Sequence, residues 1–255
     1  MSLSAASILA DLSAVDAERA RRSASSGLLA RVTALKEFQQ RRFSFTYADL
    51  LVSARYGDAA RFFLDELYGP NDFSRRDAQF ARVVPALVRL FPNEIVETVA
   101  TLAELHSLSE ALDTSMGEQL SEGLVPSLAY VAAWQRTGRE HDRRRQIELT
   151  LNVASRLDRL TRRPLMRHSL RAMRGPARAA GLGELQHFLE AGFDTFRTMK
   201  GAREFMELIS TREHALVSAL FGAPGSAAHI ADSEWPASTI LTVRRQLSWP
   251  VGSGE

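Results

Sequence analysis

Helical periodicity along residues 28–222 is the feature of this sequence that most limits its fold. Apolar residues recur there at spacings of three and four, and few runs alternate in the way that half-buried strands do. A chain of 255 residues with 45% apolar side chains is long enough to bury a core of its own. The sequence therefore predicts an all-α fold, a multi-helix bundle of about eight helices.

Proline, glycine and candidate caps mark where the helices begin and end. The predicted helices lie near residues 28–41, 46–68, 74–90, 92–116, 126–137, 139–162, 164–174, 176–199 and 202–221. Thr46 is a candidate N-cap, and Ser74 with Asp77 resembles a capping box. We expect Asp72 and Asp77 to be structural residues, which satisfy backbone donors or arginines at the turn before residue 74.

Composition divides the chain into three parts. Residues 1–27 form a predicted N-terminal extension with a short helix over 4–22, residues 28–222 a single all-helical domain, and residues 223–255 a C-terminal tail. The tail has little helical periodicity but an apolar content that is unusual for a solvated linker. Its large apolar residues are Trp235, Ile240, Leu241, Val243, Leu247, Trp249 and Val251. We therefore expect the tail to dock in an apolar groove of this chain or of a second copy.

Charge and residue usage exclude several classes of protein. The absence of cysteine rules out disulfide frameworks, thiolate nucleophiles, iron–sulfur clusters and cysteine zinc sites. Lys and Arg number 32 against 30 Asp and Glu, so the chain is not a polycation and we do not expect nucleic-acid binding. The arginines of 139–145, 162–163 and 244–245 could contact phosphate, although such runs usually mark a solvated helix face. No apolar run reaches the roughly 18 residues of a membrane span, and we expect a cytoplasmic protein.

The helix predicted near 92–116 carries the most suggestive polar residues. His106, Glu110 and Asp113 project, at spacings of four and three, onto the apolar face of that helix. Burial of carboxylate and imidazole groups is costly unless they pair or bind a ligand. Two interpretations stay open. Either the three residues belong to a buried polar or metal-binding site, or the helix leaves the core near residue 106 and they lie at the surface or pair with arginines.

Templates for known metal, haem and catalytic sites find little support. A ferritin-like di-iron site needs two Glu-x-x-His motifs, and only Glu184 and His187 have that spacing. Six histidines offer candidate haem ligands without a signature. The sequence lacks a P-loop, a Rossmann fingerprint, a nucleophile elbow and a His-Glu-x-x-His motif. We therefore assign no catalytic or cofactor-binding residue and expect no cofactor.

The segment FFLDELYGPNDFSRRD at residues 62–77 is the most distinctive of the chain. Together with RVVP at 82–85, LHSLSE at 105–110, MRGPA at 173–177 and GLGELQ at 181–186, it resembles an uncharacterised proteobacterial family of all-helical proteins. The likeness spans roughly residues 45–222 and rests on the order of these segments. It implies a bacterial cytoplasmic protein and brings no activity, cofactor or catalytic residue.

The sequence thus favours a non-enzymatic helical protein with a regulatory or scaffolding role through protein–protein interaction. We expect its partner to be a second copy of the chain or another protein. The alternative is a helical-bundle enzyme or sensor that binds metal or haem at a buried His/carboxylate site. In that case His106 and Glu110 should be buried and should meet a carboxylate or histidine from another helix, because two ligands on one turn cannot complete a metal shell.

Overall fold

The computed structural model describes residues 4–66 and 71–222. Within these residues every regular element is an α-helix, which confirms the predicted all-α fold. The helices are α1 (Ala5–Ser23), α2 (Ser26–Thr46), α3 (Ala48–Leu51), α4 (Gly57–Glu66), α5 (Ser74–Leu90), α6 (Asn93–Gly117), α7 (Ser127–Thr137), α8 (Glu140–Thr161), α9 (Pro164–Ala172), α10 (Arg174–Ala179), α11 (Gly183–Thr198) and α12 (Arg203–Gly222).

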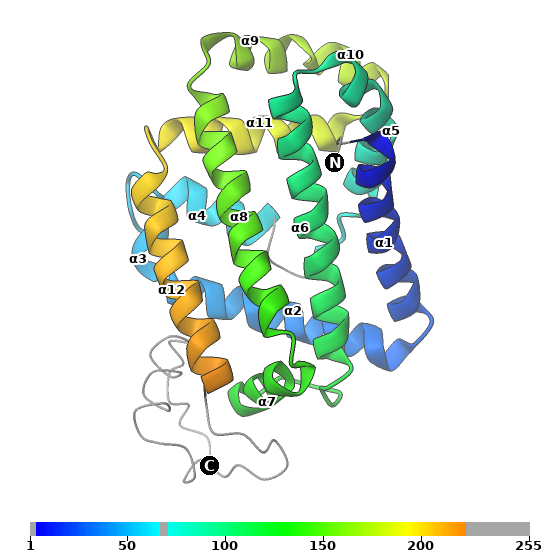
Figure 1. The fold of residues 1–255 in the computed structure, drawn as a ribbon, viewed down its shortest axis with the longest axis vertical. Helices are drawn as coiled ribbons and strands as arrows, with labels where there is room; N and C mark the ends of the chain where they lie inside the picture. The colour runs from blue at the N-terminus through cyan, green and yellow to red at the C-terminus, as the bar shows by residue number, and fades with distance from the viewer. Residues whose placement is uncertain (1–3, 67–70, 223–255) are drawn as a thin grey trace.

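Helix α6 is the central element of the bundle. It is 25 residues long and packs mainly against α1, α2 and α8, with smaller contacts to α5 and α7. α1, α6, α8 and α12 run roughly along the long axis of the molecule, whereas α2 and α11 cross them and α9 covers one end (Figure 1). Because α6 has neighbours on several sides, its inward polar side chains must find partners inside the protein.

Three clusters of buried apolar side chains hold the helices together. One joins α2, α7, α8 and α12 around Phe38 and Tyr130. Another joins α2, α4, α11 and α12 around Tyr47 and Phe63. The third places Ile8 of α1 against α5 and α6. The predicted N-terminal extension is therefore packed against the bundle through α1.

The segment predicted as one helix over 46–68 is divided in the structure. α3 ends at Leu51 and α4 begins at Gly57. Between them, the side-chain oxygen of Ser53 accepts hydrogen bonds from the N–H groups of Arg55 and Tyr56, at 3.2 Å each. Serine competes in this way with the hydrogen bonds of a helix and stabilises a turn. The prediction of a continuous helix is therefore wrong here.

Other helix ends also differ from the prediction. The segment 176–199 is divided at Gly181, whose φ of +71° ends the right-handed helical path. With the division of 46–68 and the N-terminal α1, the described helices are more numerous than the predicted number of about eight. Thr46 is the last residue of α2 and not an N-cap. Ser74 and Asp77 form no capping box. Instead, the Asp72 carboxylate accepts the Ser74 N–H at 2.9 Å, which is the structural role expected for Asp72.

None of the described helices combines the length and the apolar character needed to cross a membrane. The predicted C-terminal tail, 223–255, lies outside the described residues.

Candidate functional site

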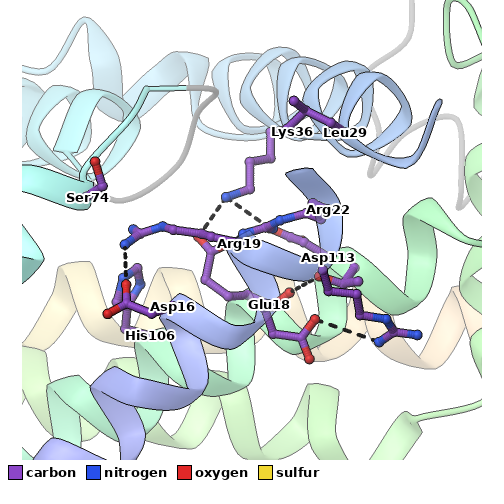
Figure 2. Close-up of polar contacts among 12 residues, drawn as sticks. Asp16, Glu18, Arg19, Arg22, Leu29, Lys36, Ser74, His106 and Asp113 are labelled. Carbon is purple, nitrogen blue, oxygen red and sulfur yellow. Dashed lines mark hydrogen bonds and ion pairs between the residues drawn. The ribbon is translucent and has the colours of Figure 1, made fainter. Parts of the chain in front are cut away.

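The inward face of α6 carries the polar residues that the sequence singles out. Glu110 and Asp113 are only 6% and 8% exposed, and the His106 side chain is 21% exposed. α6 therefore stays in the core beyond residue 106, and Glu110 and Asp113 do not lie at the surface. Glu110 does pair with an arginine, which the same interpretation allowed. The three residues are paired inside the protein with side chains from α1, α2 and α5, as Figure 2 shows for several of them.

Glu110 accepts hydrogen bonds from two cationic side chains on different helices. Arg22 of α1 and Lys36 of α2 both donate to its carboxylate, Lys36 at 2.7 Å. Figure 2 shows Lys36 extending from α2 into the network that Arg22 enters from α1. Burial raises the pKa of Glu110, but the charges and hydrogen bonds of Lys36 and Arg22 outweigh this effect and lower the pKa to about 2. Glu110 is therefore ionised at neutral pH and links three helices.

Asp113, less than one turn further along α6, has weaker partners. The side-chain amide of Gln39 donates to it at 3.0 Å, and the Nζ atom of Lys36 lies 3.8 Å away. Burial raises the pKa of Asp113, and the adjacent negative charge of Glu110 raises it further against the opposing effect of Lys36. Two neighbouring carboxyl groups of one helix thus differ in their tendency to hold a proton.

His106 and Asp77 form a second polar cluster, toward α5. Asp77 accepts a hydrogen bond from Arg19 of α1 at 2.5 Å, and its carboxylate lies 2.8 Å from the Nε2 atom of His106. Burial raises the pKa of Asp77, but hydrogen bonding and charge from His106 and Arg19 lower it to about 2. Asp77 thus has the structural role expected of it, through an arginine and not as a cap. Its contacts with Arg19 and His106 link α1 and α6 to the start of α5. Ser74 lies apart from these contacts (Figure 2).

Two buried arginines that the sequence analysis does not single out extend the network. Arg42 of α2 donates to Glu213 of α12 at 2.5 Å, and the Tyr47 hydroxyl donates to the same carboxylate oxygen at 2.7 Å. The guanidinium of Arg143, on α8, lies over the ring of Trp134 of α7, 4.1 Å from its centroid. These contacts tie α2 to α12 and α7 to α8.

A signal for both arginines is present in the sequence. Arg42 follows Leu35 and Phe38 at spacings of seven and four, and Arg143 precedes Ile147 by four. Each therefore lies on the apolar stripe of its helix, where an isolated charge indicates a buried pair. Arg143 belongs to the charged run 139–145, whose other members are exposed or half-buried. An interpretation of the whole run as a solvated helix face therefore overlooks the burial of Arg143.

These charged side chains surround a cavity of about 170 Å³ in the middle of the bundle. Its wall includes Lys36, Arg42 and Arg143 as cations and Glu110, Asp113 and Glu213 as carboxylates. Helices α4 and α11 add apolar side chains to the same wall. A protein core is normally close-packed, so a cavity of this size lined by fixed charges marks the candidate site.

The described residues bring together no metal-ligand set. Within 4–66 and 71–222, no group of three or more His, Asp or Glu side chains is placed to hold a metal ion. Glu110 is buried, and the partly buried His106 meets the Asp77 carboxylate from α5 as the metal hypothesis required, but Glu110 faces cations instead of further ligands. Glu184 pairs with Arg75 at 3.0 Å and His187 is exposed, so the Glu-x-x-His spacing lies on the outer surface of α11.

A family model described as a domain of unknown function (DUF8198) matches residues 18–226. The matched region contains α2 to α12 in full, and with them every residue of the cavity wall except Leu12. No curated protein and no solved structure matches the chain. The expected membership of an uncharacterised family is thereby confirmed. Because the model spans most of the chain, this protein belongs to the DUF8198 family.

Proposed function

We propose that this protein is a non-enzymatic regulatory protein that binds a small molecule in its central cavity. The cavity of about 170 Å³ within the polar network carries this proposal. It is similar in size to an engineered protein cavity of about 150 Å³ that takes up benzene. The charged groups of its wall are held by partners on other helices, so they are oriented before a ligand arrives, which lowers the entropic cost of binding.

A regulatory role follows from where the cavity lies. Its wall is built from α1, α2, α4 to α8, α11 and α12, so a ligand would contact helices from both ends of the described chain. Anything that binds the folded state alone stabilises that state in proportion to the logarithm of its concentration. Ligand supply would therefore set the stability of the whole bundle. A bacterial cytoplasmic location is part of the same proposal.

Ligand-observed NMR with a library of small-molecule fragments tests the cavity. The matched variants are Leu102→Trp, which places a larger side chain in the cavity wall, and Leu165→Trp, which makes the same change at an exposed position of α9. We expect fragments that bind the wild type and the Leu165→Trp protein and are lost from Leu102→Trp. No binding fragment, or equal binding to both variants, would overturn the proposal.

A scaffolding role with an acidic protein partner is the second candidate, favoured by the surface around α9 and α10. Residues 159–183 contain seven arginines and no acidic residue. Arg171 and Arg178 are exposed and form no ion pair in the described part of the chain. Leu165 and Met173, also exposed, add apolar contact area on the same segment. Because this surface is basic, it would repel its own copy, so the expected homo-oligomer would need another face.

Polyglutamate is a suitable probe for this second candidate. We expect binding that weakens with salt and is reduced by Arg171→Glu but not by Arg41→Glu, a charge reversal at an exposed arginine of α2 that also forms no ion pair in the described residues. Equal effects of the two variants, or binding of a DNA duplex in place of polyglutamate, would contradict a specific acidic protein partner. Sedimentation of the same proteins would show whether the chain self-associates.

A further inference from the structure

Two hydrogen-bond donors in the cavity wall have no acceptor among the residues that the structure describes. Trp134 and Arg42 line the cavity and are 6% and 5% exposed. Within the described residues, the indole N–H of Trp134 and the Nε–H of Arg42 are buried without a hydrogen-bond partner. Nearly all buried polar groups in native proteins are paired, so unpaired donors at a cavity point to an acceptor that the cavity receives.

Neither donor can easily turn to another partner. The guanidinium of Arg42 is fixed by its bond to Glu213. The Trp134 ring lies between the rings of Tyr130 and Phe221, with centroids at 5.8 and 6.0 Å, and carries the Arg143 guanidinium over its face. Tyr130 contacts the Trp134 ring and also interacts electrostatically with Arg42, so one tyrosine is a neighbour of both donor residues.

The Arg42 donor belongs to a cation, and this favours an anionic acceptor. Hydrogen bonds between a guanidinium and a carboxylate are charge-assisted and stronger than neutral ones. The nearby carboxylates of Glu110 and Glu213 already accept hydrogen bonds from cationic side chains. A carboxylate that enters the cavity would therefore be a suitable acceptor for the two donors.

One part of the cavity wall is apolar. Phe63 of α4, Phe188 and Leu189 of α11, and Ile209 of α12 line the cavity with hydrocarbon side chains. Such a wall binds an apolar body by removing it from water. A ligand that fits both parts has one charged end and a small hydrocarbon end.

We propose that the cavity binds a small organic monocarboxylate, whose carboxylate accepts hydrogen bonds from the Trp134 indole N–H and the Arg42 Nε–H while its hydrocarbon part lies against the apolar wall. This inference rests on the proposed function, because it names the class of the ligand. The cavity volume of about 170 Å³ limits that ligand to roughly the size of a benzene ring with its carboxyl group.

Benzoate, benzamide and toluene are the probes, because they share one ring and differ in the acceptor they carry. We expect calorimetry and ligand-observed NMR to show that wild-type protein binds benzoate at least about 10-fold more tightly than the two neutral probes. Trp134→Phe removes the indole N–H and keeps an aromatic ring. It should weaken benzoate about 10- to 100-fold and leave toluene nearly unchanged.

Tyr56→Phe is the matched control, because it removes a donor that bonds to Glu204 and that does not line the cavity. It should leave benzoate binding unchanged. If the neutral probes bind as tightly as benzoate and the Leu102→Trp variant does not bind them, the ligand need not be a carboxylate. That result would overturn this inference, while the proposed function of small-molecule binding would still stand. Equal weakening of benzoate and toluene by Trp134→Phe would also overturn it, since the ring alone would then matter. If none of the three probes binds, the inference is overturned. Whether the cavity binds any small molecule is tested separately by the fragment library.

Discussion

Replacing Glu110 with glutamine tests the network at its most highly connected residue. Glu110→Gln keeps the shape of the side chain, removes its charge and leaves Arg22 and Lys36 without their anion. The pKa of Glu110 is about 2 in the folded protein against 4.5 for the free group. At about 1.4 kcal/mol for each tenfold preference for the ionised form, this difference corresponds to about 3 kcal/mol. We therefore expect the free energy of unfolding at pH 7 to fall by about 3 kcal/mol.

Urea unfolding followed by circular dichroism measures this loss. The matched control is Glu104→Gln, which makes the same substitution on the same helix. Glu104 is 45% exposed in its side chain and accepts from Arg145 at 2.9 Å. An exposed pair of this kind contributes at most about 1 kcal/mol. The two variants should thus differ clearly in their unfolding midpoints.

The pH dependence gives a second measurement on the same proteins. Because folding lowers the pKa of Glu110, its contribution to stability is complete above about pH 4.5 and is lost as the pH falls from there toward 2. The difference between wild type and Glu110→Gln should narrow over that range. Equal midpoints for the two variants at pH 7, or a difference that widens on acidification, would refute the reasoning.

Three further substitutions test other parts of the fold by thermal or urea unfolding. Asp77→Asn should lower the free energy of unfolding by about 2 kcal/mol at pH 7, because the pKa of Asp77 is about 2 in the folded protein. This loss should disappear as the pH falls from about 4 toward 2, and a loss that does not depend on pH would contradict the prediction. Asp72→Ala removes the acceptor of the Ser74 N–H and should cost about 1 kcal/mol or less, and an unchanged melting temperature would show that water replaces the bond. Gly117→Ala makes the new Cβ overlap with a methyl group of Val32 and should cost about 1 to 3 kcal/mol, whereas Gly175→Ala, with no atom within 4 Å, should be neutral or stabilising.

The sequence predicts most of the helices because apolar spacing and turn residues are local properties. The helix predicted over 74–90 agrees with α5, and the helix near 126–137 with α7. One failure occurs where a side chain competes with the backbone. Ser53 interrupts the segment over 46–68 through its own hydrogen bonds, which periodicity does not register.

Only the part of the candidate site that lies on α6 could be identified from the sequence. The projection of His106, Glu110 and Asp113 onto an apolar face offers burial as one of two interpretations, and the structure buries Glu110 and Asp113 and leaves His106 partly exposed. Their partners come from helices about 30 to 90 residues away along the chain, such as Arg22 for Glu110. Pairing over such separations depends on how the helices pack, and helix-face projection of a single sequence contains no information on that packing.

The reactivity of the Lys36 amine can be used to measure how often the helical bundle opens. The sequence has two lysines, of which Lys200 is exposed and Lys36, with its side chain 18% exposed, holds its amine against the buried carboxylate of Glu110. An amine-specific acylating reagent should therefore modify Lys200 quickly and Lys36 only during transient openings of the bundle. The ratio of the two labelling rates, measured by mass spectrometry, gives the frequency of those openings in the unaltered protein. A molecule held beside Lys36 would slow its labelling, so the same ratio would read out occupancy of the cavity.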